Sequence, residues 1–147
     1  ILVAREQEAG PSRPYSMEKL CPVLAFYVME NEDAVLKKCI SDCVADIPFV
    51  EGFVFEVDGV TAGYGMTAIG YATEAGGICV HIEDIYIKPE FRGQGIGTAF
   101  LAFVEDCYKG KAVRYRLEVE PDNEGADRAY RRCGYSELGY RQLYKDV

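Results

Sequence analysis

Apolar positions recur every three or four residues in some stretches of the chain and alternate with polar ones in others. The first pattern predicts helices over residues 17–30, from about residue 31 to before Pro48, from near residue 98 to Gly110, and from Asn123 to Gly134. The second predicts strands over residues 1–5, 53–57, 60–71, 78–87 and 113–119, with one or two closing strands in residues 135–144. This order of elements predicts an α/β fold with a mixed, mostly antiparallel sheet flanked by helices.

Glycines mark the turns between the predicted strands. Asp58-Gly59 is a strong hairpin signal, and Gly76-Gly77 marks the next turn. Gly63 and Gly65 fall inside a strand, where glycine indicates close packing or a bulge. The run 78–87 is long and mostly apolar, so we expect it at the centre of the sheet.

A glycine-rich loop, Arg92-Gly93-Gln94-Gly95-Ile96-Gly97, joins that strand to the next helix. Glycines allow backbone N–H groups to approach a ligand closely, and a helix start adds unpaired donors and the positive end of a dipole. The loop therefore predicts a binding site for a phosphate or pyrophosphate. A Walker loop would need a Lys after its last glycine, and a dinucleotide fingerprint would need Gly where Thr98 stands.

The arrangement R-x-x-G-x-G at Arg92, Gly95 and Gly97 resembles the pyrophosphate signature of the GNAT family of acetyl-coenzyme A-dependent N-acetyltransferases. A second set, Asn123, Ala126, Tyr130 and Gly134-Tyr135, resembles that family's downstream signature. The resemblance implies the GNAT fold, and it implies acetyl-CoA as co-substrate with no metal. The implied contacts are the strand backbone for the pantetheine arm, the loop amides for the pyrophosphate, and an asparagine and a tyrosine beside them. In this sequence these are Ile85, Tyr86, Ile87, Arg92, Gly93, Gln94, Gly95, Ile96, Gly97, Thr98, Asn123 and Tyr130.

Two of these assignments, and one further group of residues, have a plain structural alternative. Arg92 either adds charge to the pyrophosphate site or only braces the loop, and Asn123 could instead cap the helix that follows it. The arginines of that helix, Arg128, Arg131 and Arg132, either meet the 3′-phosphate of coenzyme A or form a solvated face.

Acetyl transfer to an amine needs a base, because an alkyl amine with a pKa near ~10 is almost wholly protonated at neutral pH. Glu83 is our candidate base, directly or through water, with Asp84 and His81 as the other candidates. Neighbours on a regular strand face opposite ways, so Glu83 would share a face with Ile85, and both carboxylates reach one pocket only if a bulge intervenes. The resemblance places Tyr130 as the acid that protonates the departing thiolate.

Length, charge and cysteines set the wider frame. The 147 residues suit a single N-acetyltransferase domain, and no apolar run reaches the length of a membrane span. The net charge of −8 argues against nucleic-acid binding and is compatible with a cationic substrate. The six cysteines form no C-x-x-C pair, so we expect free thiols at apolar positions of the helices, no zinc site, and a cytoplasmic protein.

Together these features predict an enzyme that moves an acetyl group from acetyl-CoA to a primary amine by direct transfer in a ternary complex, with a small-molecule acceptor favoured. A few residues around Ile82-Glu83-Asp84 look most like the diamine and polyamine branch of the family. The alternatives are a non-catalytic acyl-CoA-binding sensor and a protein or peptide N-acetyltransferase. The family commonly dimerises, so a homodimer is a further expectation.

Overall fold

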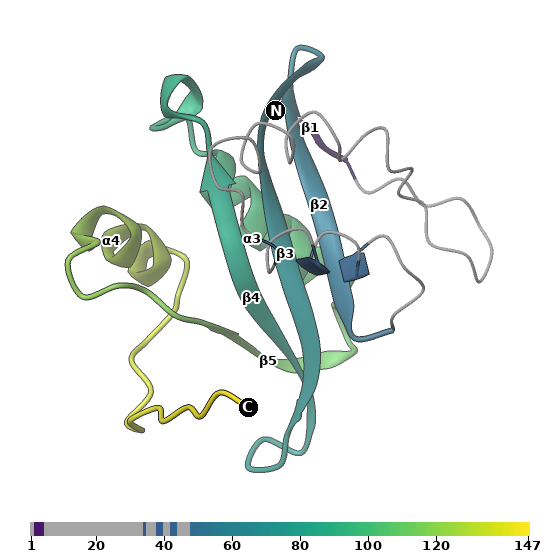
Figure 1. Ribbon diagram of the computed structural model, residues 1–147, viewed down its shortest axis with the longest axis vertical. Helices are drawn as coiled ribbons and strands as arrows, with labels where there is room; N and C mark the ends of the chain where they lie inside the picture. Colours follow the sequence, from purple (N-terminus) through teal and green to yellow (C-terminus); the bar gives the residue numbers. More distant parts are fainter. Residues whose placement is uncertain (1, 5–33, 35–37, 40–41, 44–47) are drawn as a thin grey trace.

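The computed structural model describes residues 2–4, 34, 38–39, 42–43 and 48–147. Its centre is a five-stranded sheet with the strands in sequence order (Figure 1). The strands are β1 (Leu2–Ala4), β2 (Val50–Val57), β3 (Val60–Ala72), β4 (Gly77–Ile87) and β5 (Ala112–Leu117). The helical elements are the short 3-10 helix η1 (Pro89–Phe91), α3 (Ile96–Cys107) and α4 (Glu124–Arg132).

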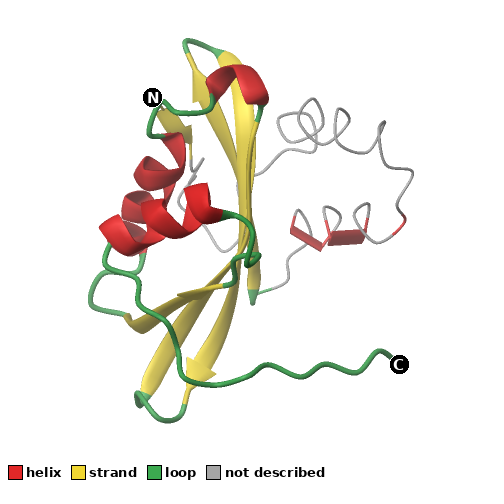
Figure 2. Cartoon of the chain, turned by 90° about the vertical axis from the view of Figure 1, so that its left-hand side faces the viewer, coloured by secondary structure: helices red, strands yellow, loops and turns green. Residues whose placement is uncertain are grey.

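Neighbouring strands are antiparallel except β4 and β5, which run parallel. Parallel neighbours need a crossover connection, and α3 is that crossover. Figure 2 shows α3 and α4 on the same side of the sheet. The mixed, mostly antiparallel fold predicted from the sequence is therefore confirmed.

Glycines occupy a hairpin turn and the closest contacts of the sheet. Asp58 and Gly59 both have positive φ, 52° and 76°, as a two-residue type I′ hairpin requires. Gly63 and Gly65 lie where β3 meets its neighbours most closely. An added Cβ at Gly63 would stand 2.0 Å from the carbonyl oxygen of Tyr86, and one at Gly65 would stand 2.5 Å from the Phe100 ring. The close packing predicted at these two glycines is confirmed.

The core lies between the sheet and α3. Phe53 and Phe55 of β2 pack on Phe100 of α3, with ring centroids 5.4 and 4.9 Å apart. All three side chains are fully buried, and Val80 and Ile82 of β4 extend the same cluster. This packing fixes the direction in which α3 leaves the glycine-rich loop.

Several sequence predictions need correction or lie outside the described residues. Residues 135–147 form no strand: Gly139 interrupts the alternation, Leu143 and Tyr144 break it by standing side by side, and both are exposed. The strand 78–87 is paired on both sides, but β3 holds the middle of the five-stranded order. The helix predicted over 17–30 lies outside the described residues.

The second predicted helix is seen at the described positions 34, 38–39 and 42–43, which are all helical. Cys43 is buried there and packs beside Gly52, whereas Cys39 is exposed, so the expectation of thiols at apolar positions of the helices holds for Cys43 and not for Cys39. All described cysteines are free thiols.

Candidate active site

A bulge in β4 shapes the site. In the pairing of β3 with β4, Met66 lies opposite Asp84 and Thr67 opposite Ile82, so Glu83 has no partner of its own. An extra residue of this kind bends the strand and re-aims the side chains around it. The bulge that the sequence required for Glu83 and Asp84 to reach one pocket is therefore present.

Next to the bulge, β4 and β5 part. Their parallel pairing ends at Ile82 and Leu117, while β4 continues to Ile87. The space between them is a cavity of about 560 Å³, well within the range of small-molecule sites. It is lined by Ile82, Glu83, Asp84, Ile85, Leu117, Glu118, Val119, Glu120, Asn123 and Tyr130.

The three candidate bases lie together at this cavity or beside it. Glu83 and Asp84 both line it, and His81 stands against Glu83, with 3.5 Å between Nδ1 and Oε1. The other ring nitrogen, Nε2, is 3.9 Å from Oε1 of Glu118. On a regular strand Glu83 and Ile85 would lie on the same face of the sheet. The bulge lies between them, so they do not.

The environment of Asp84 favours its neutral form. The residue is open toward the cavity, yet the protein atoms around that cavity desolvate the carboxyl and raise its pKa above the ordinary 3.8. A carboxyl with a raised pKa inside a cleft is a common mark of a functional site.

Tyr130 reaches the cavity from α4. The ring packs against the core and against Tyr135, with ring centroids 6.2 Å apart. Burial raises the pKa of the Tyr130 phenol above 10, so the hydroxyl keeps its proton at neutral pH. Such a group can donate a hydrogen bond or a proton into the cavity.

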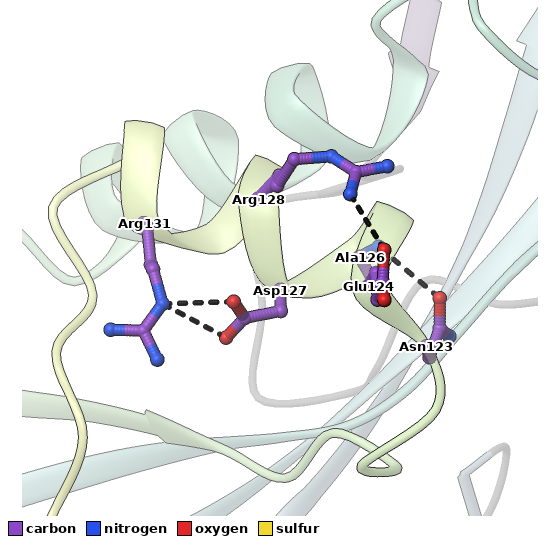
Figure 3. Close-up of polar contacts among 6 residues, drawn as sticks. All are labelled: Asn123, Glu124, Ala126, Asp127, Arg128 and Arg131. Atoms are coloured by element: carbon purple, nitrogen blue, oxygen red, sulfur yellow. Dashed lines mark hydrogen bonds and ion pairs between the residues drawn. The ribbon is translucent and has the colours of Figure 1, made fainter.

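Asn123 begins α4 as its N-cap (Figure 3). Its Oδ1 accepts the backbone N–H of Ala126 at 3.2 Å, which is the capping role that the sequence left open. Because Asn123 also lines the cavity, capping holds this side chain at the rim. Its amide NH₂ makes no hydrogen bond to any described residue.

Two arginines of α4 are held by acidic residues of the same helix. Arg128 meets Glu124 at 3.1 Å and Arg131 meets Asp127 at 2.8 Å, both one turn apart (Figure 3). Among the described contacts Arg132 forms no ion pair. Of the three arginines predicted to meet a 3′-phosphate, it is therefore the one whose charge is not already neutralised by a described acidic side chain.

The glycine-rich loop turns sharply between η1 and α3. Gly93 and Gly95 have φ of 74° and 80°, which only glycine adopts at low cost, and no other atom would meet a Cβ at either position. Arg92 donates from Nε to the carbonyl oxygen of Ile87 at 2.9 Å, so it braces the loop against the end of β4. The first hydrogen bond of α3 runs from Ala99 N–H to Gly95 O, which leaves the preceding N–H groups of the helix without an intrahelical acceptor.

Glu118 and Glu120 line the cavity but were not among the sequence candidates. They follow β5, on the polar positions of the run that alternates with Leu117 and Val119. That alternation predicts that the two glutamates share a face, but only the parting of β4 and β5 shows that this face borders the cavity.

Within the part of the chain that the structure describes, no group of His, Cys, Asp and Glu side chains is placed to bind a metal ion. In the same part, no helix is long and apolar enough to cross a membrane.

Known proteins resemble this chain over most of its length. Residues 19–135 match the sequence profile of the acetyltransferase (GNAT) family. A thialysine N-epsilon-acetyltransferase of Mus musculus is 28% identical over 94% of this chain and 84% of its own length. A protein of Bacillus subtilis, provisionally named a ribosomal protein bS18-alanine N-acetyltransferase, is 37% identical over 66% of this chain. The chain spans only 61% of that relative's length.

Solved structures share the fold. A possible acetyltransferase from Clostridium difficile superposes with a TM-score of 0.73 at 23% identity, covering 90% of this chain and 94% of that one. The aminoglycoside N-acetyltransferase AAC(6')-Iy, solved with CoA, superposes with a TM-score of 0.65 at 19% identity over 89% and 96%. With the profile match over residues 19–135, the chain belongs to the GNAT family of acetyltransferases and is an acyltransferase.

Proposed function

We propose that the protein transfers the acetyl group of acetyl-CoA directly to a primary amine of a small molecule. The observation that carries this proposal is the cavity at the parting of β4 and β5, which brings the two bulge carboxylates and the Tyr130 phenol to one space. The thialysine acetyltransferase among the relatives acts on a small amine, which supports a small-molecule acceptor here. The alanine acetyltransferase name supports a peptide acceptor as the second candidate.

The end of β4 offers backbone groups to the pantetheine arm of the cofactor. The carbonyl oxygen of Tyr86 is directed at Gly63 of β3, and Lys88 N–H donates to Ala62 O at 2.9 Å. In an antiparallel pair alternate residues point their backbone groups to opposite sides, so those of Ile85 and Ile87 turn away from β3. Ile85 lines the cavity, and the carbonyl oxygen of Ile87 accepts the hydrogen bond from Arg92. We therefore assign the arm to Ile85 and Ile87, with Tyr86 between them bound to the sheet.

The pyrophosphate fits the start of α3. The N–H groups of Ile96, Gly97 and Thr98 point out of the helix end, and the positive-φ glycines Gly93 and Gly95 leave open space beside them. Arg92 shapes the loop through the hydrogen bond from its Nε to Ile87 O, and its terminal guanidinium nitrogens keep their charge for the pyrophosphate.

The chemical step needs a proton removed from the ammonium form of the acceptor and a proton supplied to the departing thiolate. In this proposal Glu83 accepts the first proton, directly or through water, with Asp84 and His81 as the alternatives beside it. The amine nitrogen then bonds to the thioester carbon, the C–S bond breaks, and Tyr130 donates its proton to the sulfur and is reprotonated from solvent. The amide product loses its remaining extra proton to water, which balances the step.

The proposal is tested by thiol release from acetyl-CoA over a panel of amines. Tyr130→Phe should lower kcat by roughly 10²-fold or more while leaving KM for acetyl-CoA within about twofold, since general acids contribute ~10²–10⁴-fold. Glu83→Gln should lower kcat and remove the acidic limb of the pH profile. Tyr140→Phe, which removes a hydroxyl from an exposed tyrosine outside the cavity, is the matched control. Full kcat with an unchanged pH profile in Tyr130→Phe would refute its role.

A further inference from the structure

Helix α4 is attached to the body of the protein at its C-terminal end. None of its residues is buried, and Tyr130 is the residue of α4 that packs against the core cluster. The next contacts with that cluster come from Cys133 and Tyr135, which follow the last residue of the helix. The position of the Tyr130 side chain therefore depends on how α4 ends.

The end of α4 is a Schellman motif in which Tyr130 takes part. The carbonyl oxygen of Tyr130 accepts the backbone N–H of Tyr135 at 3.1 Å, and that of Arg131 accepts the N–H of Gly134 at 3.1 Å. Gly134 has a φ of 90°, the left-handed conformation that this motif uses. An added Cβ at Gly134 would meet no atom within 4 Å, so the position favours glycine for its backbone conformation and not for space.

The turn brings the ring of Tyr135 back onto the ring of Tyr130. Their centroids lie 6.2 Å apart with an interplanar angle of 56°, which is the side-chain contact that often accompanies a Schellman motif. Burial, and then the nearby charge of Glu105 on α3, raise the pKa of the Tyr135 phenol. Tyr135 therefore connects Tyr130 to the packed layer that contains α3.

No hydrogen bond explains the hydroxyl group of Tyr135. Its oxygen is buried and has no hydrogen-bond partner among the described residues. A buried polar atom without a partner costs stability, so any benefit of Tyr135 lies in its ring. Phenylalanine should therefore support Tyr130 as well as tyrosine does, whereas a small side chain should not.

We propose that Tyr135, together with the turn at Gly134, is a positioning residue that holds the Tyr130 phenol at the cavity. This inference rests on the proposed function, in which Tyr130 protonates the departing thiolate. A general acid must lie within hydrogen-bond reach of the reacting atom, and a displacement of about 1 Å can cost ~10²-fold in rate. Without the ring of Tyr135, the Tyr130 side chain can turn away from the cavity and water can reach its hydroxyl.

The first test measures kcat and KM for thiol release in single and double variants. Tyr135→Ala should lower kcat about tenfold with KM for acetyl-CoA within about twofold, whereas Tyr135→Phe should keep kcat within about twofold. In a Tyr130→Phe background, Tyr135→Ala should change kcat by less than about twofold, because the group that it positions is gone. An unchanged kcat in Tyr135→Ala, or the same loss in both backgrounds, would overturn the inference.

A matched pair of glycines separates positioning from loss of stability. Gly110 follows α3, lies outside the cavity, has a φ of 73° and, like Gly134, has no atom within 4 Å of an added Cβ. Gly134→Ala and Gly110→Ala should therefore lower Tm by similar amounts, but only Gly134→Ala should lower kcat. Gly134→Asn should recover most of that loss, because asparagine adopts positive φ more readily than alanine. Equal kcat in the two alanine variants would contradict the proposed role of the turn.

Titration of the Tyr130 phenol separates this inference from the proposed function. If Tyr130→Phe keeps full kcat, Tyr130 is not the acid and that part of the proposed function fails. The phenol can still be titrated by NMR of protein with isotope-labelled tyrosine, in which the Tyr130 signal is the one absent from Tyr130→Phe. The variants retain the ionisable groups that line the cavity with it: Glu83, Asp84, Glu118 and Glu120.

Burial raises the pKa of the Tyr130 phenol above 10 in the wild type. This pKa should fall toward 10 in Tyr135→Ala, because water reaches the hydroxyl, and it should stay raised in Gly110→Ala. Tyr135→Phe removes the second phenol but keeps the ring, so it should also leave the pKa of Tyr130 raised. An unchanged pKa in Tyr135→Ala would show that Tyr135 does not hold Tyr130 in place, whatever the outcome of the kinetic tests.

Discussion

Replacing Gly65 by alanine is expected to destabilise the protein by forcing α3 away from the sheet. The new Cβ would stand 2.5 and 2.6 Å from two carbons of the Phe100 ring and 3.0 Å from the Phe55 ring. Real Cβ contacts are essentially never this close, and both rings are fully buried in the core, so neither can swing into solvent. Something in the packing between β3 and α3 must therefore move.

Overpacking of this kind costs about 1–3 kcal/mol, because rings and backbone must shift together. For a chain of this size that corresponds to a fall in Tm of roughly 3–10 °C. The displacement should also reach the glycine-rich loop, since Phe100 lies on the first turns of α3. KM for acetyl-CoA should therefore rise by several fold. Proton transfer to a base at the bulge should be unaffected.

Thermal unfolding and denaturant titration measure the loss, and Gly70→Ala on the same strand is the control. There the nearest atom to an added Cβ is the carbonyl oxygen of Cys79 at 3.9 Å, an ordinary contact. Alanine at that position should be neutral or stabilising by up to about 1 kcal/mol, because it restricts the unfolded chain.

A second variant tests the cause. Phe100→Leu shortens the ring that blocks the new methyl group, so Gly65→Ala should cost less in that background than in the wild type. If Gly65→Ala costs no more than Gly70→Ala, or if its cost is the same with Leu at position 100, then the contact with Phe100 does not explain the glycine.

Three further changes test local interactions. Asn123→Ala should cost about 0.5–2 kcal/mol through loss of the N-cap, whereas Asn123→Asp should retain it; equal losses in unfolding titrations would argue against capping. Tyr108→Phe removes a 2.6 Å hydrogen bond to Glu51 and should lower the free energy of unfolding by about 0.5–1.5 kcal/mol, measured in the same way. An unchanged free energy of unfolding would show that this hydrogen bond does not stabilise the protein. Burial raises the pKa of Asp84, so the folded state binds this proton more tightly than the unfolded state, and ionisation costs stability above the folded pKa. Asp84→Asn should therefore raise Tm at about pH 7.5 and change it little at about pH 3.5. For the control Asp106→Asn we expect a shift in Tm that does not depend on pH. The same pH-independent shift in Asp84→Asn would contradict the prediction.

Local chemistry made much of the structure predictable. The Asp58-Gly59 turn and the glycine-rich loop depend on residues that are near one another in the chain, and each stands where the sequence predicts it. The cap at Asn123 is equally local, and the sequence offered it as an alternative to a cofactor contact. The closing strands of residues 135–144 depend on a partner edge, which no local pattern supplies, and this prediction failed. The inclusion of Glu118 and Glu120 in the cavity likewise depends on where β5 leaves β4, which is a property of two strands and not of one.

The bulge can be recognised in the sequence from a change in the spacing of the apolar residues along β4. Val80 and Ile82 belong to the core beneath α3, and a regular strand would continue that face at position 84. The chain instead has apolar residues at Ile85 and Ile87, which also pack against the core cluster. A shift of one residue moves every later side chain to the other face, so the hydrophobic face can stay continuous only if one residue is inserted between Ile82 and Ile85. The two residues in that interval are the carboxylates that line the cavity. The same insertion therefore keeps α3 packed on β4 and aims the acidic side chains at the proposed acceptor.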